Sequence, residues 1–151
     1  EKADLTEESL KVALKQEIGQ GLVTVEKKED KVIVTVGAGG AFPSGTAQLT
    51  PAAKKIMSNI AKVNKKGTSN IKVTGHTDNV PLLFGSQYRD NWDLAAARAS
   101  SVVQSLQETN VIDAKRLIAT SKGETQPIAS NQTRQGRSKN RRIEIEINYG
   151  K

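Results

Sequence analysis

Residues 71–78 read IKVTGHTD, a run in which apolar and polar positions alternate before a glycine and three polar residues. This alternation predicts a half-buried β-strand that ends near Gly75 and continues into a loop. From Asn91 to Leu106, apolar residues recur every three to four positions, which predicts a helix. A strand, a loop and a helix in this order can place the strand end beside the first turns of the helix. We therefore expect this junction to position the polar groups that matter most.

Further strands and helices are predicted on both sides of the junction. Thr50 followed by Pro51 indicates a helix start, because a capping hydroxyl before a proline is typical there. Residues 143–147 alternate strictly between Ile and Glu, which predicts a strand with one buried face. The expected helices cover about 6–19, 51–66 and 91 onward, and the expected strands 22–26, 32–36, 71–74, 117–120 and 143–147. The order βαβαββ, preceded by a helix and a strand, predicts an α+β fold built as a two-layer α/β sandwich.

The chain has 151 residues, of which 36% are hydrophobic, so it can bury one sizeable core. We expect one domain over residues 32–151, preceded by an N-terminal helix and strand linker region over residues 1–31. The sequence contains no cysteine, which excludes disulfides and thiolate metal sites. Its longest weakly polar run, residues 32–42, is about half of the ~20 apolar residues that a membrane-spanning helix needs. Because the chain begins without Met or a signal pattern, we expect a mature product or a fragment, with any membrane segment of the parent upstream.

Basic residues outnumber acidic ones, with 23 Lys and Arg against 16 Asp and Glu and a net charge of +7. This excess favours an anionic partner, such as nucleic acid, acidic lipid head groups or a carboxylate-bearing polymer. The clearest nucleic-acid signal is residues 131–142, with five basic residues and no acid. That run has no aromatic residue to stack on bases, so a solvated basic loop leading into a strand is the simpler interpretation. We therefore expect no nucleic-acid partner.

The titratable residues give little support for catalysis or metal binding. His76 is the only histidine, and without cysteine a metal site would have only scattered carboxylates. No nucleophile elbow is present, and the chain has no cysteine that could pair with His76. Asp78 and Asp93 could pair as glycosidase carboxylates, but Asp93 is more simply an early-helix acid that interacts with the helix dipole. We expect no enzymatic activity, no cofactor and no metal, and we expect Trp92 to lie in the core.

Three polar residues are predicted to share a pocket. Asn91 and Arg98 are seven positions apart, so they lie along one line of the helix surface. Asp78, at the end of the preceding strand, can pack beside that helix and face Arg98 across a pocket. This pair suits a zwitterion, because Asp78 accepts from an ammonium and Arg98 donates to a carboxylate. So few bonds give weak binding per site, which a polymeric ligand offsets through multivalency.

These residues belong to three blocks that follow one another along the chain. They read Thr74-Gly75-His76-Thr77-Asp78, then Asn91-x-x-Leu94-x-x-x-Arg98-Ala99, then Asn140-Arg141-Arg142-Ile143-Glu144-Ile145. In this order they resemble the signature of the OmpA-like peptidoglycan-binding domain, over about residues 32–148. The resemblance implies that Asp78 and Arg98 bind the amino and carboxylate groups of diaminopimelate in the peptide stem, with Asn91 assisting.

The same resemblance implies further contacts to the ligand. Thr77 and Leu94 belong to the first two blocks and are expected to line the site. One arginine of the third block is expected to brace the pocket, and we favour Arg142 over Arg141.

Other segments narrow the resemblance. They are Asp78-Asn79-Val80-Pro81, Asn91-Trp92-Asp93-Leu94, Phe42-Pro43-Ser44-Gly45-Thr46-Ala47 and the long loop from 79 to 90. These are similar to flagellar stator B subunits of the MotB/PomB type, and Phe42 to Gly45 favour the sodium-driven PomB branch. Two positions depart from the pattern: Ala95 stands where the family usually has Ser, and no glycine follows Asp78 closely. The first departure removes a possible hydroxyl contact, and the second leaves the ligand contacts of the loop undefined.

The stator resemblance implies a mechanical role without catalysis. Such a domain fixes the ion-driven stator to the cell wall, so that torque turns the rotor in motility and chemotaxis. It also implies a periplasmic domain of an inner-membrane protein, a homodimer and a channel-forming A subunit as partner, with a switching role for residues 1–31. The alternatives are another OmpA-like cell-wall tether, a basic nucleic-acid-binding domain and a cell-wall hydrolase.

Overall fold

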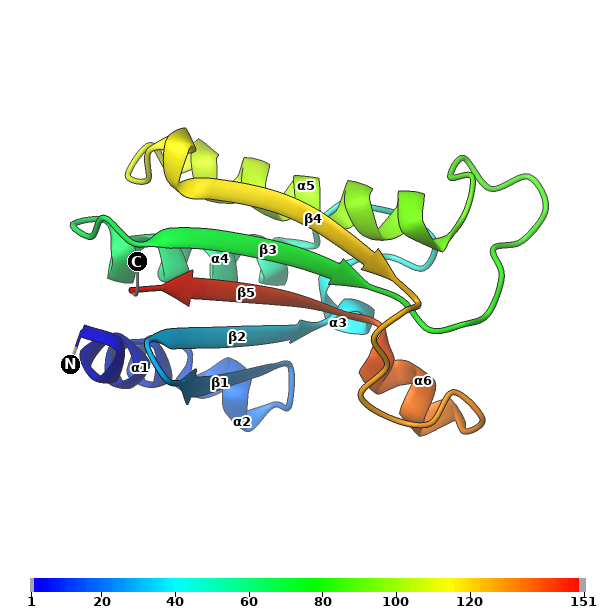
Figure 1. The fold of residues 1–151 in the computed structure, drawn as a ribbon, viewed down its shortest axis with the longest axis horizontal. Helices are drawn as coiled ribbons and strands as arrows, with labels where there is room; N and C mark the ends of the chain where they lie inside the picture. Colours follow the sequence, from blue (N-terminus) through cyan, green and yellow to red (C-terminus); the bar gives the residue numbers. More distant parts are fainter. Residues whose placement is uncertain (1, 150–151) are drawn as a thin grey trace.

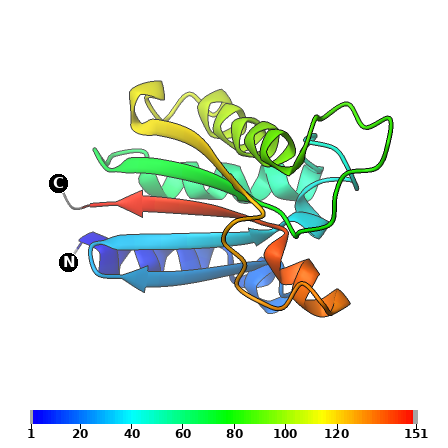
Figure 2. The same cartoon turned by 45° about the vertical axis from the view of Figure 1, so that its right-hand side comes forward.

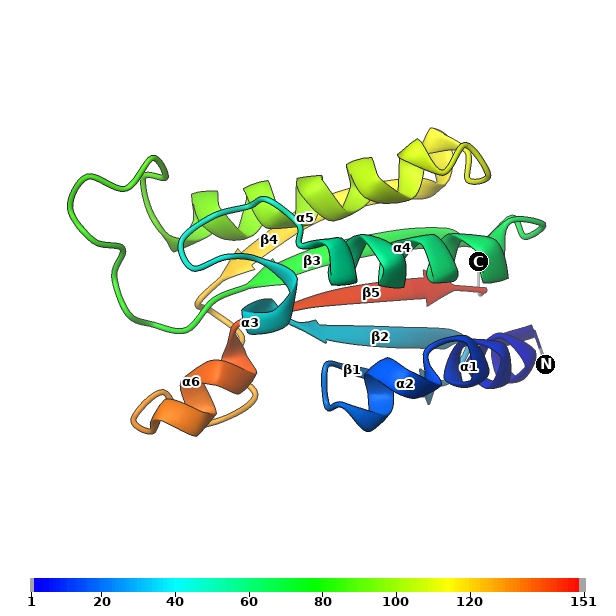
Figure 3. The ribbon, with the colours of Figure 1, turned by 180° about the vertical axis from the view of Figure 1, so that it is seen from behind.

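The computed structural model describes residues 2–149, which form a five-stranded sheet with the long helices on one face (Figures 1 and 3). The strands are β1 (Val23–Lys28), β2 (Lys31–Gly37), β3 (Asn70–His76), β4 (Leu117–Gly123) and β5 (Arg142–Asn148). The helices are α1 (Lys2–Ala13), α2 (Lys15–Gly19), α3 (Ala38–Ala41), α4 (Pro51–Asn64), α5 (Asn91–Glu108) and α6 (Arg134–Asn140), with a 3₁₀ turn η1 (Ala114–Arg116). The strand order is β1-β2-β5-β3-β4, in which only β3 and β4 run parallel. The predicted α+β sandwich is confirmed.

The hydrophobic core lies between the sheet and helices α1, α4 and α5. Ile145 on β5 is fully buried and pairs with Val34 on β2 and Val73 on β3, so β-branched side chains cross the sheet in a row. Burial of each such side chain contributes roughly 1.5–3 kcal/mol. The start of α4 is as predicted, since the Thr50 hydroxyl accepts from the Ala53 N–H at 3.2 Å.

The N-terminal segment packs on the same sheet. β1 pairs with β2 from Val23 opposite Val36 onward, and α1 contacts α4 and β1. Leu10 and Leu14 are fully buried in the common core. The predicted first helix is divided into α1 and α2, which meet at Leu14. The domain boundary between residues 31 and 32 stays a prediction.

The basic run before β5 contains helix α6 in place of the predicted loop. The Thr133 hydroxyl accepts from the Gly136 N–H at 3.0 Å and caps this helix. A Cβ atom on Gly136 would lie 1.8 Å from the Ser130 carbonyl oxygen, so the close turn requires glycine. α6 carries no apolar stripe, and hydrophobic periodicity therefore does not indicate it.

The prediction that Trp92 lies in the core is wrong. Its side chain is 49% exposed and covers Gly123 at the end of β4, where an added Cβ would lie 3.1 Å from the indole. Trp92 thus occupies the flank of α5 beside the strand end, whereas the buried side of the helix carries Leu94, Ala95 and Ala99.

Gly75 brings α5 into close contact with β3. A Cβ atom at Gly75 would lie 2.2 Å from the Ala95 carbonyl oxygen, so the helix crosses the strand at backbone distance. The first turns of α5 consequently lie beside the residues that follow β3. Figure 2 shows α3, α6 and the long loop 79–90 gathered at this end of the sheet. Among residues 2–149, no helix is long and apolar enough to cross a membrane.

Candidate ligand-binding pocket

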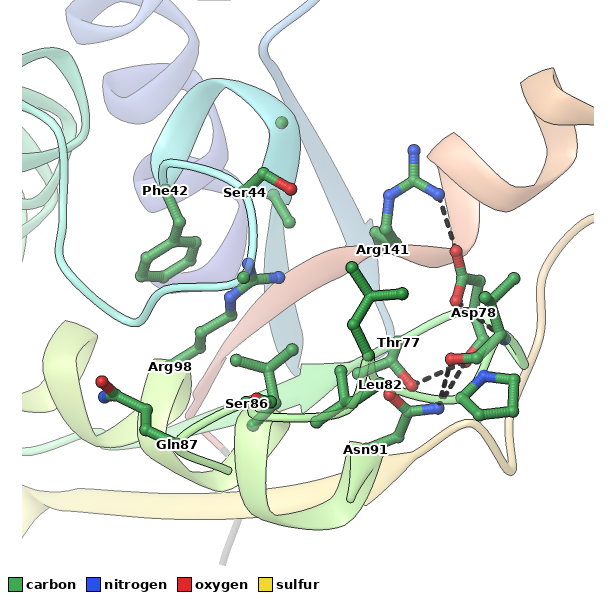
Figure 4. A pocket seen from close by; sticks show the side chains of 17 residues that line it. Phe42, Ser44, Thr77, Asp78, Leu82, Ser86, Gln87, Asn91, Arg98 and Arg141 are labelled. Carbon is green, nitrogen blue, oxygen red and sulfur yellow. Dashed lines mark hydrogen bonds and ion pairs between the residues drawn. The ribbon is translucent and has the colours of Figure 1, made fainter. Parts of the chain in front are cut away.

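A pocket of about 650 Å³ lies at the end of β3, between the loop 79–90, the start of α5 and the segment around α3 (Figure 4). Its lining combines a few charged groups with an apolar wall from the loop. The lining residues are Ala38, Gly39, Phe42, Ser44, Gly45, Thr77, Asp78, Val80, Pro81, Leu82, Leu83, Ser86, Gln87, Asn91, Leu94, Arg98 and Arg141. The structure thus brings together five of the six residues predicted as ligand contacts, all except Arg142.

Asp78 is a nearly buried carboxylate with both oxygens engaged. Its Oδ2 accepts from Arg141 Nη1 at 2.6 Å, and its Oδ1 accepts from the Val80 N–H at 3.0 Å. The side chain is 11% exposed, so a burial cost accompanies its charge. These two contacts fix the carboxylate in one orientation at the pocket wall.

Thr77 and Asn91 hold the backbone around Asp78. The Thr77 hydroxyl donates to the Asp78 carbonyl at 2.7 Å, and Asn91 Nδ2 lies 3.3 Å from the same carbonyl and 3.1 Å from that of Val80. Asn91 Nδ2 also reaches Glu124 Oε1 at 3.3 Å. Both side chains therefore order the strand end and the first residues of the loop.

Arg98 presents a guanidinium to the pocket from α5. Its Nε donates to the Thr46 carbonyl at 2.8 Å, and its guanidinium carbon lies 4.9 Å from the centre of the Phe42 ring, which adds a cation–π contact. Arg98 is only 6% exposed, yet within residues 2–149 no carboxylate forms an ion pair with it. Burial lowers the pKa of Arg98, and the positive charge of Arg141 acts in the same direction, whereas Tyr88 and Asp78 raise it. A buried guanidinium with free N–H groups is a strong site for an anion.

Arg141, and not Arg142, occupies the pocket. Arg141 is the C-cap residue of α6 and pairs with Asp78. Arg142, the next residue, is 3% exposed and donates to Glu144 Oε2 at 2.7 Å. Arg142 also donates to the carbonyls of Asn140 and Gln126. The expectation that Arg142 braces the pocket is thus corrected: Arg142 holds the loop before α6 against β5, on the far side of the strand from the pocket.

A second polar group lies behind the pocket. His76 pairs with Arg142 across β3 and β5, and its Nε2 lies 3.6 Å from Glu144 Oε1. Neither ring nitrogen of His76 has a hydrogen bond within residues 2–149. The same part of the chain has no cluster of three or more His, Cys, Asp or Glu residues that could hold a metal ion.

Sequence patterns indicated the charged residues of the pocket better than its apolar wall. Val80, Leu82 and Leu83 come from the long loop, whose sequence has no regular period from which these contacts could be predicted. Phe42 belongs to the segment that resembles stator B subunits, and an aromatic ring directly after a glycine-rich run is a signal that could indicate a pocket wall. Leu94, as expected, lines the pocket and is 5% exposed.

Comparison with known families settles the kind of domain. The model of the OmpA family matches residues 41–141, which include all of the pocket lining except Ala38 and Gly39. The chain belongs to the OmpA family. As an OmpA-family domain it is structural and non-catalytic, and this confirms the prediction that it is not an enzyme.

Curated relatives carry this OmpA domain in longer proteins. Motility protein B of Bacillus subtilis is 40% identical over 120 residues, which are 77% of this chain and 44% of that protein. The peptidoglycan-binding protein ArfA of Mycobacterium tuberculosis is 36% identical over 109 residues, 72% of this chain and 32% of that protein. The chain therefore spans less than half the length of either relative.

Solved structures share the fold over most of the chain. The cell wall anchor of the type VI secretion system from Pseudomonas aeruginosa is 33% identical, with a TM-score of 0.81 over 92% of this chain and 96% of that chain. The periplasmic domain of Helicobacter pylori MotB is 27% identical, with a TM-score of 0.75 over 83% of this chain and 78% of that chain. The predicted similarity to MotB-type OmpA domains is confirmed.

Proposed function

We propose that the chain binds peptidoglycan and acts as a non-catalytic anchor to the cell wall. The observation that carries this proposal is the buried guanidinium of Arg98, which points into the pocket without an acidic partner among the described residues, near the carboxylate of Asp78. Its OmpA-family membership and the similarity to the peptidoglycan-binding protein ArfA support the same ligand.

The expected ligand group is the diaminopimelate end of the peptide stem. Its carboxylate would accept from Arg98, and its ammonium would donate to Asp78 and to backbone carbonyls nearby. Each charge-assisted bond contributes about 1.5–3 kcal/mol, much of which ordering of the ligand offsets. Affinity for one stem is therefore modest, and a wall with many stems supplies the firm attachment.

Within the cell, we propose a MotB-type role in the flagellar stator. The similarity to Motility protein B and to the periplasmic domain of MotB supports a periplasmic location. With the stator role we also propose a membrane segment outside this chain, a homodimer and a channel-forming A subunit as partner. Residues 42–45 favour the sodium-driven PomB branch. In this role the domain resists the reaction torque of the motor.

A second candidate is a cell-wall tether of another machine. The cell wall anchor from Pseudomonas aeruginosa matches almost end to end, with a TM-score of 0.81. Replacement of the corresponding region of Bacillus subtilis Motility protein B by the whole chain, residues 1–151, separates the candidates. Restored swimming supports the stator role, and retained wall binding without swimming favours the other tether.

Retention on purified sacculi tests the wall-binding proposal. Arg98→Gln and Asp78→Asn each leave one charge of the ligand unpaired, which costs about 2 kcal/mol or roughly a 30-fold loss in affinity. Lys55→Gln, on the exposed face of α4, removes a positive charge that does not line the pocket and serves as control. Equal retention of wild type, Arg98→Gln and Asp78→Asn would overturn the pocket assignment, and release of muropeptides during incubation would contradict a non-catalytic role.

A further inference from the structure

The charged groups that line the pocket do not balance one another. Arg98, Arg141 and Asp78 are the charged residues of the lining, and together they carry a formal charge of +1. Glu124 accepts a hydrogen bond from Asn91, but the Glu124 side chain is exposed to solvent and does not line the pocket. A plain zwitterion, which has no net charge, would leave this surplus uncompensated.

Arg141 neutralises Asp78 before any ligand arrives. The 2.6 Å bond from Arg141 Nη1 to Asp78 Oδ2 pairs the two charges and leaves Arg98 as the unmatched cation. Arg141 is itself 39% exposed and uses one of its five N–H groups in this bond. Its other N–H groups make no hydrogen bond to residues 2–149, so they are available to a ligand.

Two guanidiniums therefore reach the same space. Figure 4 shows Arg98 beside Phe42 and Arg141 beside Asp78, both at the pocket wall. The two positive charges repel each other, since the charge of Arg141 helps to lower the pKa of Arg98. A volume of about 650 Å³ exceeds what one amino acid end needs and has room for a second anionic group.

We propose that Arg141 is a specificity-determining residue that binds a second carboxylate, so that the pocket prefers a ligand end with one ammonium and two carboxylates over a plain zwitterion. This inference rests on the proposed binding of diaminopimelate. In a stem peptide that ends at diaminopimelate, the second carboxylate is the free one beside the acylated amine. Amidation of that carboxylate would then weaken attachment without any change in the protein.

A pair of small ligands tests the proposal. The first is diaminopimelate acetylated on one amine, which keeps one ammonium and two carboxylates. The second is the same molecule with the carboxylate beside the acetylated amine converted to a carboxamide. Isothermal titration calorimetry at fixed salt gives the ratio of their dissociation constants for the wild type, and we expect the dicarboxylate to bind about tenfold more tightly, as one charge-assisted hydrogen bond implies.

Variants of Arg141 separate ligand contact from mere bracing. Arg141→Gln should bring the ratio to about one, Arg141→Lys should keep most of the preference, and Arg134→Gln on the exposed side of α6 should leave it unchanged. A residue that only braces Asp78 would weaken both ligands alike, with the ratio intact, and this result would overturn the proposal.

The proposed function and this inference fail in different ways. Equal binding of the two ligands by the wild type overturns the role of Arg141 and leaves wall binding at the pocket in place. Binding of neither ligand at millimolar concentration overturns the diaminopimelate site, and the inference with it.

Discussion

Glu144, behind the pocket, gives the sharpest prediction about stability. It lies between His76, whose Nε2 is 3.6 Å from Glu144 Oε1, and Arg142, whose Nε donates to Oε2 at 2.7 Å. The contacts with His76 and Arg142 outweigh partial burial and lower the pKa of Glu144 from 4.5 to about 2. The carboxylate is thus more stable in the folded chain than in the unfolded one.

The size of the effect follows from the two pKa values. At 1.36 kcal/mol per pKa unit, a change from 4.5 to about 2 corresponds to about 3 kcal/mol at pH 7. The His76 distance is too long for a good hydrogen bond and the Glu144 side chain is 31% exposed, so we expect about 2 kcal/mol. Because the folded-state pKa is lowered, this stabilisation is present above pH 4.5 and is lost as pH falls towards 2.

Urea unfolding at several pH values measures this contribution. We expect Glu144→Gln to lower the free energy of unfolding by about 2 kcal/mol at pH 7, and the two proteins to become equally stable near pH 2. Glu146→Gln on the same strand removes a surface partner of Lys31, at 3.6 Å, and should cost less than about 1 kcal/mol. A difference between wild type and Glu144→Gln that stays constant from pH 7 to pH 2 would refute this reasoning.

Three further substitutions test the packing that supports the pocket, each by urea unfolding. Gly75→Ala would place a Cβ 2.2 Å from the Ala95 carbonyl oxygen and should lower the free energy of unfolding by about 3 kcal/mol or more. Gly39→Ala, with open space around it, is the control and should cost less than about 1 kcal/mol. Similar losses of stability in the two variants would contradict the close approach of α5. Asn140→Ala removes a fully buried amide with four hydrogen bonds to the loop after β4 and should lower the free energy of unfolding by roughly 3 kcal/mol. A loss below about 1 kcal/mol would contradict the role of Asn140 in holding this loop. Phe84→Ser changes a fully exposed side chain at the loop tip and should alter stability by no more than about 0.5 kcal/mol; a larger loss would mean that the ring packs on the domain.

Most of the sheet could be predicted because its residues obey a simple period. The alternation at residues 143–147 gives β5 a buried face, and the Thr50-Pro51 pair marks the start of α4 within a residue. Helix α6 could not be predicted in this way, because its stability comes from the Thr133 cap and the turn at Gly136 rather than from an apolar stripe. Such contacts depend on the folded chain.

The charged part of the pocket was accessible from spacing, and one error was avoidable. Asp78, Asn91 and Arg98 line one pocket, as a strand end followed by two helical turns suggests. Arg142 was misplaced, although the two-residue period of β5 puts it on the same face as Glu144 and opposite the buried Ile143. The apolar wall from the loop could not be predicted, because a loop has no period from which to infer contacts.

The central claim is that the pocket around Asp78 and Arg98 binds the stem of peptidoglycan. The most direct test is a nuclear magnetic resonance titration of the chain with a muropeptide that contains diaminopimelate. We predict that the backbone amides of Thr77 to Val80 and the Nε–H of Arg98 shift with one common dissociation constant, while amides of α1 and β1 stay unchanged. Shifts confined to other surfaces, or no shifts from a domain that is still retained on sacculi, would contradict it.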